Sequence, residues 1–351
     1  MSEQSAKQSL SRRRQFKLLA VLFGLVSALL ILEIALRIGG HKPWSPPPAH
    51  IRIEPGNRMF QALAEGGYRH LPGRYKVILA PEYSFQMSHL EWGLRSTKAP
   101  VSSSDDYGKP PEIWFMGCSI THGWGVNDRD TYAWKIQEKF GAHNVVNAGV
   151  GGYGTLQSRL FFQDLLQHRG KPALVVYAYG RFHDFRNTFV RTWRKGFVPN
   201  NKSPNLRIPT ARLDGESLDY HLTPAEYHEW PFQGWLATSH YLERLHNFRE
   251  ANASRSDEVS RELIKNWAAA CLRDGIQFVV AGISSDAAPM LEWCSRLGIK
   301  TIDISMPLSD PANTNHPYDN HPNAKSHTVY AERLTEFIQP ILTKERVGSA
   351  D

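Results

Sequence analysis

From residue 111 to residue 342, short apolar runs rich in β-branched residues alternate with stretches that space their apolar side chains as a helix does. The strand-like runs are 112–118, 144–147, 173–179, 277–283 and 300–304, and the helix-like stretches are 131–140, 155–168, 256–273, 286–297 and 324–342. Strands separated by helices pair in parallel, and continuous apolar runs indicate a sheet covered on both faces. The pattern therefore predicts an α/β fold with a parallel sheet and right-handed crossovers.

The N-terminus carries a second strong signal. Residues 1–17 are polar and basic, and residues 18–38 are almost entirely apolar. This length suits a helix of about 20 residues that crosses a bilayer. The arginine-rich flank predicts a cytoplasmic N-terminus, with the rest of the chain outside. A cleaved signal peptide is the competing interpretation, but the apolar region is long for one and no clear small-x-small cleavage site follows it.

Between the apolar stretch and residue 111, two further regions are expected. Residues 39–56 are rich in proline and predict a stiff, extended spacer without folded elements. Residues 57–110 predict a small β appendage, with strands at Tyr75–Leu79 and Tyr83–Met87 and a polar loop at Ser102–Gly108.

The α/β domain is then expected at 111–345, interrupted by a long segment at 185–250 that is rich in aromatic residues and proline. Loops of this length are uncommon in compact domains unless they fold over something. The segment is interpreted as a cap that shapes a substrate cleft. An inert insertion with a small core of its own is the alternative.

Composition excludes some classes of function. The net charge of +7 is modest and owes much to the basic N-terminal tail, so a nucleic-acid partner is not expected. The three cysteines form no CxxC pair and show no metal-ligand spacing. We therefore expect no metal and no cofactor, and free buried thiols rather than a Cys271–Cys294 disulfide. His122 is expected at a helix entry and His327 in a hydrogen bond inside the fold.

Chemically capable residues cluster in four loops. These are 117–121, 147–154, 180–184 and 319–323. The first three follow predicted strands and the fourth precedes the last helix. Ligands of open parallel sheets bind at the carboxyl ends of the strands, so the four loops are expected to meet there.

The types of residue in these loops suit acyl transfer. The hydroxyl of Ser119 needs a general base to become a nucleophile near neutral pH, and histidine is the residue type suited to that role, which makes His321 the candidate base. A carboxylate is needed to orient that histidine, and Asp319 lies two residues before it. The amides of Ser119 and Gly152 are candidate donors to an oxyanion. Taken separately, the glycine-rich loop could be a plain strand-to-helix turn, and 319–323 a helix entry capped by Asn323.

Together, the blocks Gly117-Cys118-Ser119-Ile120-Thr121, 147–154 and Asp319-Asn320-His321-Pro322-Asn323 resemble the GDSL/SGNH esterase and acetyltransferase superfamily over residues 111–342. The resemblance implies a flavodoxin-like three-layer α/β/α sandwich. It also implies Ser119 as nucleophile, His321 as base, Asp319 as its orienting carboxylate and Gly152 as an oxyanion donor. Cys118 stands where the family usually has Asp, and the Asp-x-His spacing replaces Asp-x-x-His.

One departure affects the chemistry. In the third block the family carries an asparagine that donates to the oxyanion, and here His183 occupies that place. An imidazole N–H can also donate a hydrogen bond. The resemblance favours an esterase that removes small acyl groups, chiefly acetyl, from a cell-envelope or extracellular glycan or another small ester. A polysaccharide O-acetyltransferase with the same triad, and a glycan-binding scaffold inactivated by His183, are the alternatives.

Overall fold

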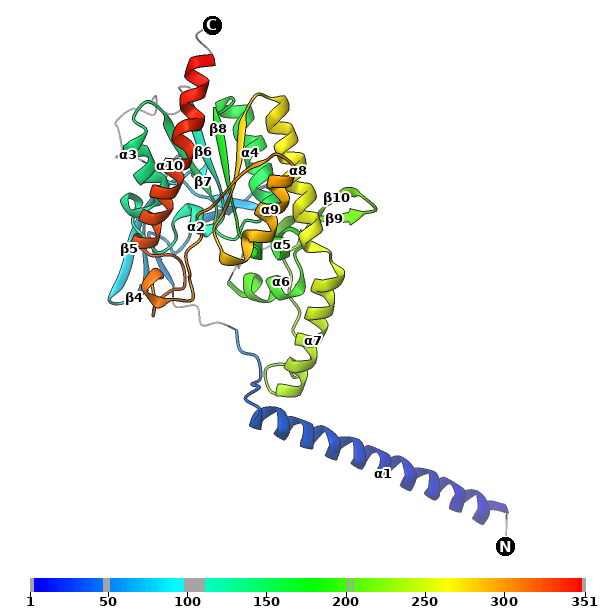
Figure 1. The fold of residues 1–351 in the computed structure, drawn as a ribbon. Coiled ribbons are helices and arrows are strands. Elements are labelled where there is room, and N and C mark those ends of the chain that lie inside the picture. The colour runs from blue at the N-terminus through cyan, green and yellow to red at the C-terminus, as the bar shows by residue number, and fades with distance from the viewer. Residues whose placement is uncertain (1–2, 47–50, 98–110, 201–202, 204, 349–351) are drawn as a thin grey trace. The chain divides into compact units, whose positions relative to one another are not determined.

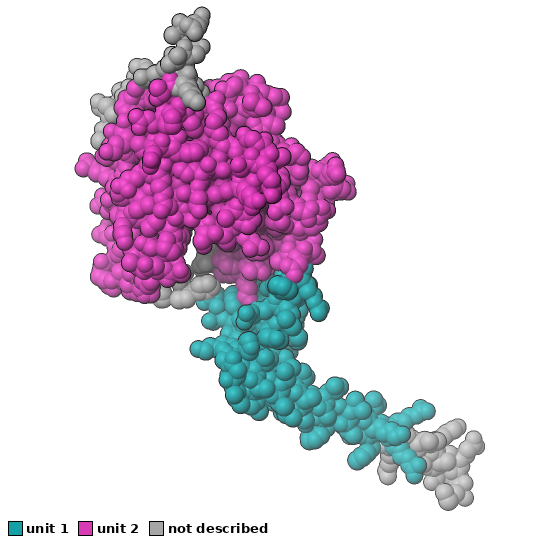
Figure 2. All heavy atoms as spheres, viewed as in Figure 1, with its two compact units in different colours: residues 1–47, 227–250 teal, residues 48–226, 251–351 magenta. Residues whose placement is uncertain are grey.

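The structure is a computed structural model that describes residues 3–46, 51–97, 111–200, 203 and 205–348. The chain forms two compact units, coloured separately in Figure 2. The smaller comprises residues 1–47 and 227–250, and the larger comprises residues 48–226 and 251–351.

The larger unit is built on a five-stranded parallel sheet (Figure 1). Its strands are β6 (Glu112–Gly117), β7 (Asn144–Gly149), β8 (Leu174–Tyr179), β11 (Gln277–Gly282) and β12 (Lys300–Asp303). They lie in the order β12-β11-β8-β6-β7. With the strands renumbered along the chain this is the flavodoxin-like order 2-1-3-4-5, whose switch point lies between β6 and β8. The predicted fold class and all five strands are confirmed.

Helices cover both faces of the sheet, and the residue alternation along each strand explains why. Ile113 and Phe115 pack with α3 (Tyr132–Lys139) and α10 (Ala324–Gly348). Trp114 and Met116 point to the other face. There they pack in a core with α4 (Thr155–Arg169), α8 (Ser256–Arg273) and α9 (Ala288–Arg296). Successive side chains of a strand point to opposite faces, so an unbroken apolar run supplies both cores.

The residues before the main sheet form small antiparallel sheets. The two expected strands are present as β4 (Gly73–Ala80) and β5 (Tyr83–His89), which pair antiparallel, and β2 (Phe60–Ala62) pairs with β3 (Tyr68–His70). The proposed spacer is structured at one point: β1 (Arg52–Glu54) pairs with β4. The unpaired edge of β4 explains this, because its backbone groups accept a strand regardless of the prolines nearby. The predicted loop at 102–108 lies outside the described residues.

The segment 185–250 contains regular elements that belong to both units. It continues α5 (Phe182–Asn187) and adds α6 (Arg191–Phe197), β9 (Arg207–Asp214) and β10 (Ser217–Pro224) in the larger unit. The β9–β10 hairpin packs on the sheet's helical layer, where Ala211 joins a small core with Leu156, Val259 and Leu263. Residues 227–250, with the greater part of α7 (Ala237–Ala253), belong to the smaller unit.

The smaller unit contains α1 (Glu3–Ile38), and within its segment Arg13–Ile38 the apolar 18-residue window has a mean hydropathy of 2.6. By length and composition this helix is able to cross a membrane, and its apolar window is not buried in protein. Near its end, the Glu33 carboxylate accepts hydrogen bonds from the amides of Ala237 and Thr238, at 2.9 and 2.8 Å. Glu33 therefore caps the start of α7.

Candidate active site

Ser119 is presented at a sharp turn after β6. The strand ends at Gly117, Cys118 is extended, and Ser119 opens the short helix α2 (Ser119–His122). Gly117 has φ +154°, and a Cβ there would lie 2.4 Å from Thr121 Oγ1. The turn therefore requires glycine at 117, and it places the hydroxyl of Ser119 at the carboxyl end of the sheet.

The three predicted triad residues are brought together. Ser119 Oγ lies 2.8 Å from His321 Nε2, and His321 Nδ1 lies 2.6 Å from Asp319 Oδ1. The His321 backbone amide also donates to Asp319 Oδ1 at 2.6 Å, so the loop bends back on itself. This explains how residues two apart in sequence can face each other.

The Asp319 carboxylate is held in its charged form. Burial raises its pKa, but the hydrogen bonds and the charge of His321 outweigh burial and bring the pKa below its ordinary value. Trp124 Nε1 donates to the second carboxylate oxygen, Oδ2, at 3.2 Å. The His321 side chain remains 32% exposed.

Two backbone amides, in the loops after β6 and β7, are candidate hydrogen-bond donors to a substrate. Within the described residues, the amides of Ser119 and Gly152 have no hydrogen-bond acceptor. Gly152 has φ +84°, and a Cβ there would lie 2.3 Å from the Tyr68 hydroxyl. The two loops that carry these amides are joined by Asn147, whose side chain donates to Thr121 O and accepts from the Gly149 amide. The amides of Ser119 and Gly152 are therefore potential hydrogen-bond donors, and the backbone of each loop fixes their direction.

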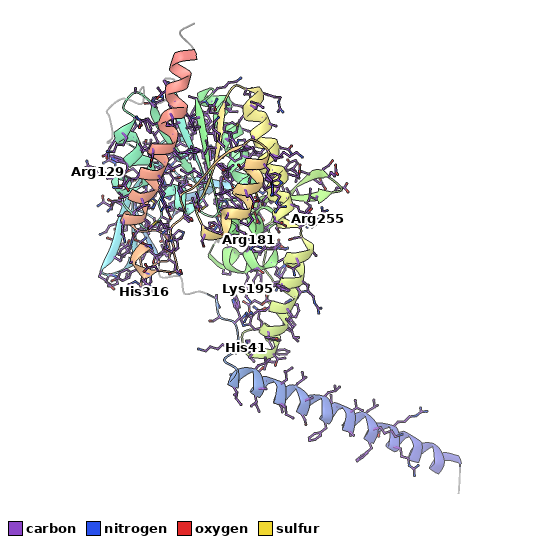
Figure 3. The ribbon with its side chains drawn as sticks, in the orientation of Figure 1. His41, Arg129, Arg181, Lys195, Arg255 and His316 are labelled. Atoms are coloured by element: carbon purple, nitrogen blue, oxygen red, sulfur yellow. The ribbon has the colours of Figure 1, made fainter. Side chains whose placement is uncertain are left out.

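His183 is placed differently from the triad. It is fully buried, and its Nδ1 lies 2.9 Å from the Tyr177 hydroxyl, which in turn donates to Thr155 Oγ1. Burial, with the charge of Arg186, holds the pKa of His183 well below its usual range, so the ring is neutral. Among the described residues no hydrogen bond joins His183 to Ser119, Gly152 or His321. Arg181, from the third loop, and His316, which precedes the fourth loop, are labelled in Figure 3 in the lower part of the larger unit.

Residues far from the four loops support the site, and no local pattern in the sequence indicates them. The Tyr83 hydroxyl lies 2.7 Å from Gly125 O and 2.6 Å from Asn315 Oδ1. Asn315 in turn donates to the backbone oxygens of His321 and Pro322. Tyr83 precedes the site by more than thirty residues of chain, so only the folded structure reveals the connection.

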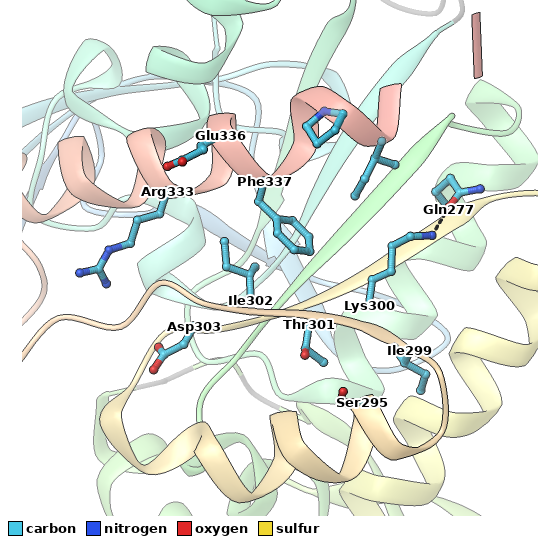
Figure 4. A pocket seen from close by; sticks show the side chains of 12 residues that line it. Gln277, Ser295, Ile299, Lys300, Thr301, Ile302, Asp303, Arg333, Glu336 and Phe337 are labelled. Carbon is cyan, nitrogen blue, oxygen red and sulfur yellow. Dashed lines mark hydrogen bonds between the residues drawn. The ribbon is translucent and has the colours of Figure 1, made fainter. Parts of the chain in front are cut away.

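Two hollows of the larger unit lie away from the triad. One of about 1050 Å³ runs along the edge strand β12 beside α10, and Figure 4 shows Lys300, Ile302 and Phe337 in its wall. Another of about 590 Å³ lies between α4 and the β9–β10 hairpin, with Tyr153 in its lining. Neither is lined by Ser119, Asp319 or His321.

Solved structures similar to this chain are described as GDSL proteins, the family that the sequence blocks resemble. A member of the lipolytic protein G-D-S-L family from Veillonella parvula is 10% identical, with a TM-score of 0.38, over 64% of this chain and 96% of that one. A GDSL-like lipase from Bacteroides thetaiotaomicron is 14% identical, with a TM-score of 0.36, over 70% of this chain and 94% of that one. No family model and no curated protein matches the sequence. Because these similarities are shallow, the role of the site rests on its own geometry.

Proposed function

We propose that this chain is a serine-dependent ester hydrolase that works through an acyl-enzyme on Ser119. The observation that carries the proposal is the continuous hydrogen-bonded series from Ser119 Oγ through His321 to Asp319. A hydroxyl, an imidazole and a carboxylate in this order are the parts that nucleophilic acyl transfer needs. Their position at the carboxyl ends of a parallel sheet supports the same function.

In the first half of the reaction, His321 Nε2 accepts the proton of Ser119 while Oγ attacks the ester carbonyl carbon. The amides of Ser119 and Gly152 donate to the resulting oxyanion. His321 then gives its proton to the leaving alcohol oxygen as the carbon–oxygen bond breaks. In the second half, His321 accepts a proton from the water that attacks the acyl carbon, and it gives this proton to Ser119 Oγ as the bond between Oγ and the acyl carbon breaks and the acid leaves. Asp319 stabilises the imidazolium throughout.

The same proposal includes a substrate and a location. An acetyl ester of a cell-envelope or extracellular glycan suits an enzyme that an N-terminal helix holds at a membrane, with its larger unit outside the cytoplasm. The capping of α7 by Glu33 supports retention of the helix, because cleavage after residue 38 would remove those hydrogen bonds. His183 is part of the proposal only as a support of the loop after β8, since its ring nitrogen bonds to Tyr177.

The test is hydrolysis of a chromogenic acetyl ester by the full chain in detergent. Ser119→Ala should lower kcat by on the order of 10⁴-fold or more. Ser295→Ala, which changes an exposed serine in the wall of the β12 hollow, should leave it unchanged. Mass spectrometry of the parent with the ester should detect one acetyl group on Ser119. Equal turnover by parent and Ser119→Ala would reject the site.

The orientation has a separate test. A reporter fused after Asp351 that is active only outside the cytoplasm should be active in cells. Activity of a cytoplasmic reporter at the same position would reject the proposed location while leaving the chemistry of Ser119 standing.

A further inference from the structure

Three histidines that the proposed reaction does not use are gathered beneath the nucleophile loop. His70 ends β3, His89 ends β5 and His122 ends α2. All three are buried, being 0%, 4% and 1% exposed, and their ligand atoms lie within 4.8 Å of one another. Three imidazoles from three separate elements meet here, in a unit where the sequence predicts no metal.

The ring nitrogens of this cluster are incompletely satisfied. Neither ring nitrogen of His70 has a hydrogen bond of normal geometry, although a backbone interaction with Gly93 acts to raise the pKa of this ring. The Nδ1 atom of His122 also has no hydrogen-bond partner. A buried polar atom without a partner costs about 1–3 kcal/mol. Such atoms in a native fold require a compensating interaction, and a metal ion provides one.

The third histidine has its tautomer set. His89 Nδ1 lies 3.2 Å from the Leu71 carbonyl oxygen, so Nδ1 carries the proton and Nε2 presents a lone pair. A backbone acceptor on the far nitrogen is the usual support of a metal-binding histidine. His89 Nε2 and His122 Nε2 are 2.9 Å apart. Two nitrogens bound to one Zn²⁺ at tetrahedral geometry are about 3.3 Å apart, so this pair needs little adjustment.

The electrostatics suit neutral ligands. Burial lowers the pKa of all three rings, to about 3 for His89, and the Arg95 charge lowers them further. The Arg95 guanidinium is itself balanced by Asp128, whose Oδ1 lies 2.5 Å from Arg95 Nε.

We propose that His70, His89 and His122 bind a borderline divalent metal ion, with Zn²⁺ as the ion of choice. Imidazole ligands favour Zn²⁺ and related transition metals over Mg²⁺ or Ca²⁺. The His70 ring is stacked on those of His89 and His122, with its centroid 4.3 and 4.2 Å from theirs. To bind the same ion as the other two rings, the His70 ring must rotate about its Cβ–Cγ bond. The ion clamps β3 and β5 to α2, the helix that Ser119 begins.

The test compares His70→Phe with His327→Phe in full chains purified with a histidine-free tag. Phenylalanine keeps a stacking ring at 70 and removes the ligand. His327 is an equally buried histidine, stacked on Tyr132 outside the cluster. After chelator treatment, Zn²⁺ loading and desalting, the parent and His327→Phe should retain about one Zn²⁺ per chain and show a raised Tm. Co²⁺ should give them visible d–d bands.

We expect His70→Phe to fold, and a metal-free Tm equal to that of the metal-free parent would show this. The variant should retain no Zn²⁺, and its Tm should not rise when Zn²⁺ is added. A parent chain that retains no Zn²⁺ would overturn the proposal. So would retention of Zn²⁺ by His70→Phe at the parent's level. Neither readout depends on esterase activity, so the result stands apart from the proposed function.

A different observation concerns the smaller unit. On α7 the buried side chains between Ala237 and Glu250 include Glu243 and Asn247, whereas Leu242, Leu245 and Phe248 are 48%, 42% and 66% exposed. The apolar face of this helix segment is thus the exposed one. Just before it, Phe232 and Trp235 are 66% and 78% exposed.

This surface is continuous with the end of α1. Glu33 caps α7, and Arg37 Nη2 donates to Trp235 O at 2.8 Å. We also infer that Trp235 and the apolar face of α7 lie in the membrane–water interface on the non-cytoplasmic side. Aromatic rings and amphipathic helices are enriched in this interface. Arg244 and Arg249 are exposed on the same segment and can meet lipid phosphates. The inference rests on the proposed membrane anchoring of α1.

Cysteine variants labelled with an environment-sensitive fluorophore test it in phosphatidylcholine–phosphatidylglycerol vesicles. The native cysteines are buried, so an introduced Phe248→Cys is labelled selectively. A probe at 248 should be quenched by lipid-borne quenchers and shielded from iodide, whereas one at Leu297→Cys, exposed in the larger unit, should behave oppositely. Equal iodide quenching at 248 and 297 would overturn the inference. A Leu25→Cys probe that lipid quenchers do not reach would instead reject the anchor itself.

Discussion

At the scale of single residues, the proposed catalysis depends on how Asp319 is held. One oxygen faces His321, and the other accepts from Trp124 Nε1 at 3.2 Å. Trp124→Phe keeps an aromatic ring against Phe85 but removes the donor. A hydrogen bond to a charged group contributes about 1.5–3 kcal/mol, so kcat should fall about 10- to 100-fold with little change in KM.

Steady-state kinetics of Trp124→Phe, Asp319→Asn and the double variant would check this positioning role. Asp319→Asn should lower kcat by about 10⁴-fold, because the imidazole loses the partner that sets its tautomer. The double variant should be no worse than Asp319→Asn alone. Additive losses would mean that Trp124 acts on something other than the carboxylate.

A second residue predicts how stability depends on pH. Burial raises the pKa of Asp184 to about 7, and the Tyr179 hydroxyl donates to its Oδ1 at 2.8 Å. An unfolded aspartate titrates near 4, so between about pH 4 and pH 7 the native state holds a proton that the unfolded state has lost. The protonated Asp184 carboxyl therefore contributes to stability at low pH. This contribution is lost as pH rises from the unfolded to the folded pKa, at about 1.4 kcal/mol for each pH unit.

Asp184→Asn removes this titration and keeps an oxygen for Tyr179. Its Tm should exceed that of the parent by more at pH 8 than at pH 5 in thermal melts. Other titrating groups are shared by both chains and cancel in the comparison. A Tm difference that is the same at both pH values would show that Asp184 does not titrate in this range.

The triad could be predicted from the sequence because its members lie in short blocks at the ends of predictable elements. Ser119 follows a strand, and Asp319 and His321 precede a helix. Trp124 and the histidines 70, 89 and 122 could not, since their roles arise from contacts between elements far apart in the chain. His183 differs from the triad: its block is recognisable in the sequence, but its bond to Tyr177 in the interior is visible only in the structure.

At the scale of elements, the alternation of strands and helices was sufficient to predict the parallel sheet. The pairing of strands outside this sheet could not be predicted from it. β1 lies in a region whose prolines indicate an open spacer, yet it pairs with β4. The segment 185–250 carries too little periodicity to predict that it contributes a hairpin to one unit and a helix to another. Packing surfaces supplied by other elements determine both outcomes.

The start of α7 illustrates such a dependence. Thr238 Oγ1 and its amide both donate to Glu33 Oε2 at 2.8 Å. Thr238→Val keeps the shape and removes one donor, and the cap should weaken by about 1 kcal/mol. Hydrogen exchange of amides 237–241 should become several-fold faster, while the exchange of α8 stays unchanged. Ser239→Ala, which loses a hydrogen bond to Pro231 O instead, is the matched control.

At the scale of the whole larger unit, the small N-terminal β4–β5 hairpin contacts loops of the candidate site through Tyr83. Tyr83 on β5 joins Gly125, after the nucleophile helix, to Asn315, before the triad loop. Burial and the Asp319 charge raise the pKa of Tyr83 to about 12, so its hydroxyl stays a donor at neutral pH. Tyr83, which precedes the parallel sheet, therefore links the loop that follows Ser119 to the loop that precedes Asp319. The proposed catalysis needs these two loops at a fixed separation.

Tyr83→Phe should loosen those loops without changing any group that reacts. Loss of one buried hydrogen bond costs about 1 kcal/mol, so Tm should fall slightly and kcat severalfold, with the acetyl-enzyme still forming on Ser119. Tyr220→Phe, at an exposed tyrosine on β10 that accepts from Arg159, should change neither. If Tyr83→Phe lowers Tm but leaves kcat at the parent value, the β4–β5 hairpin stabilises the fold alone and does not position the triad.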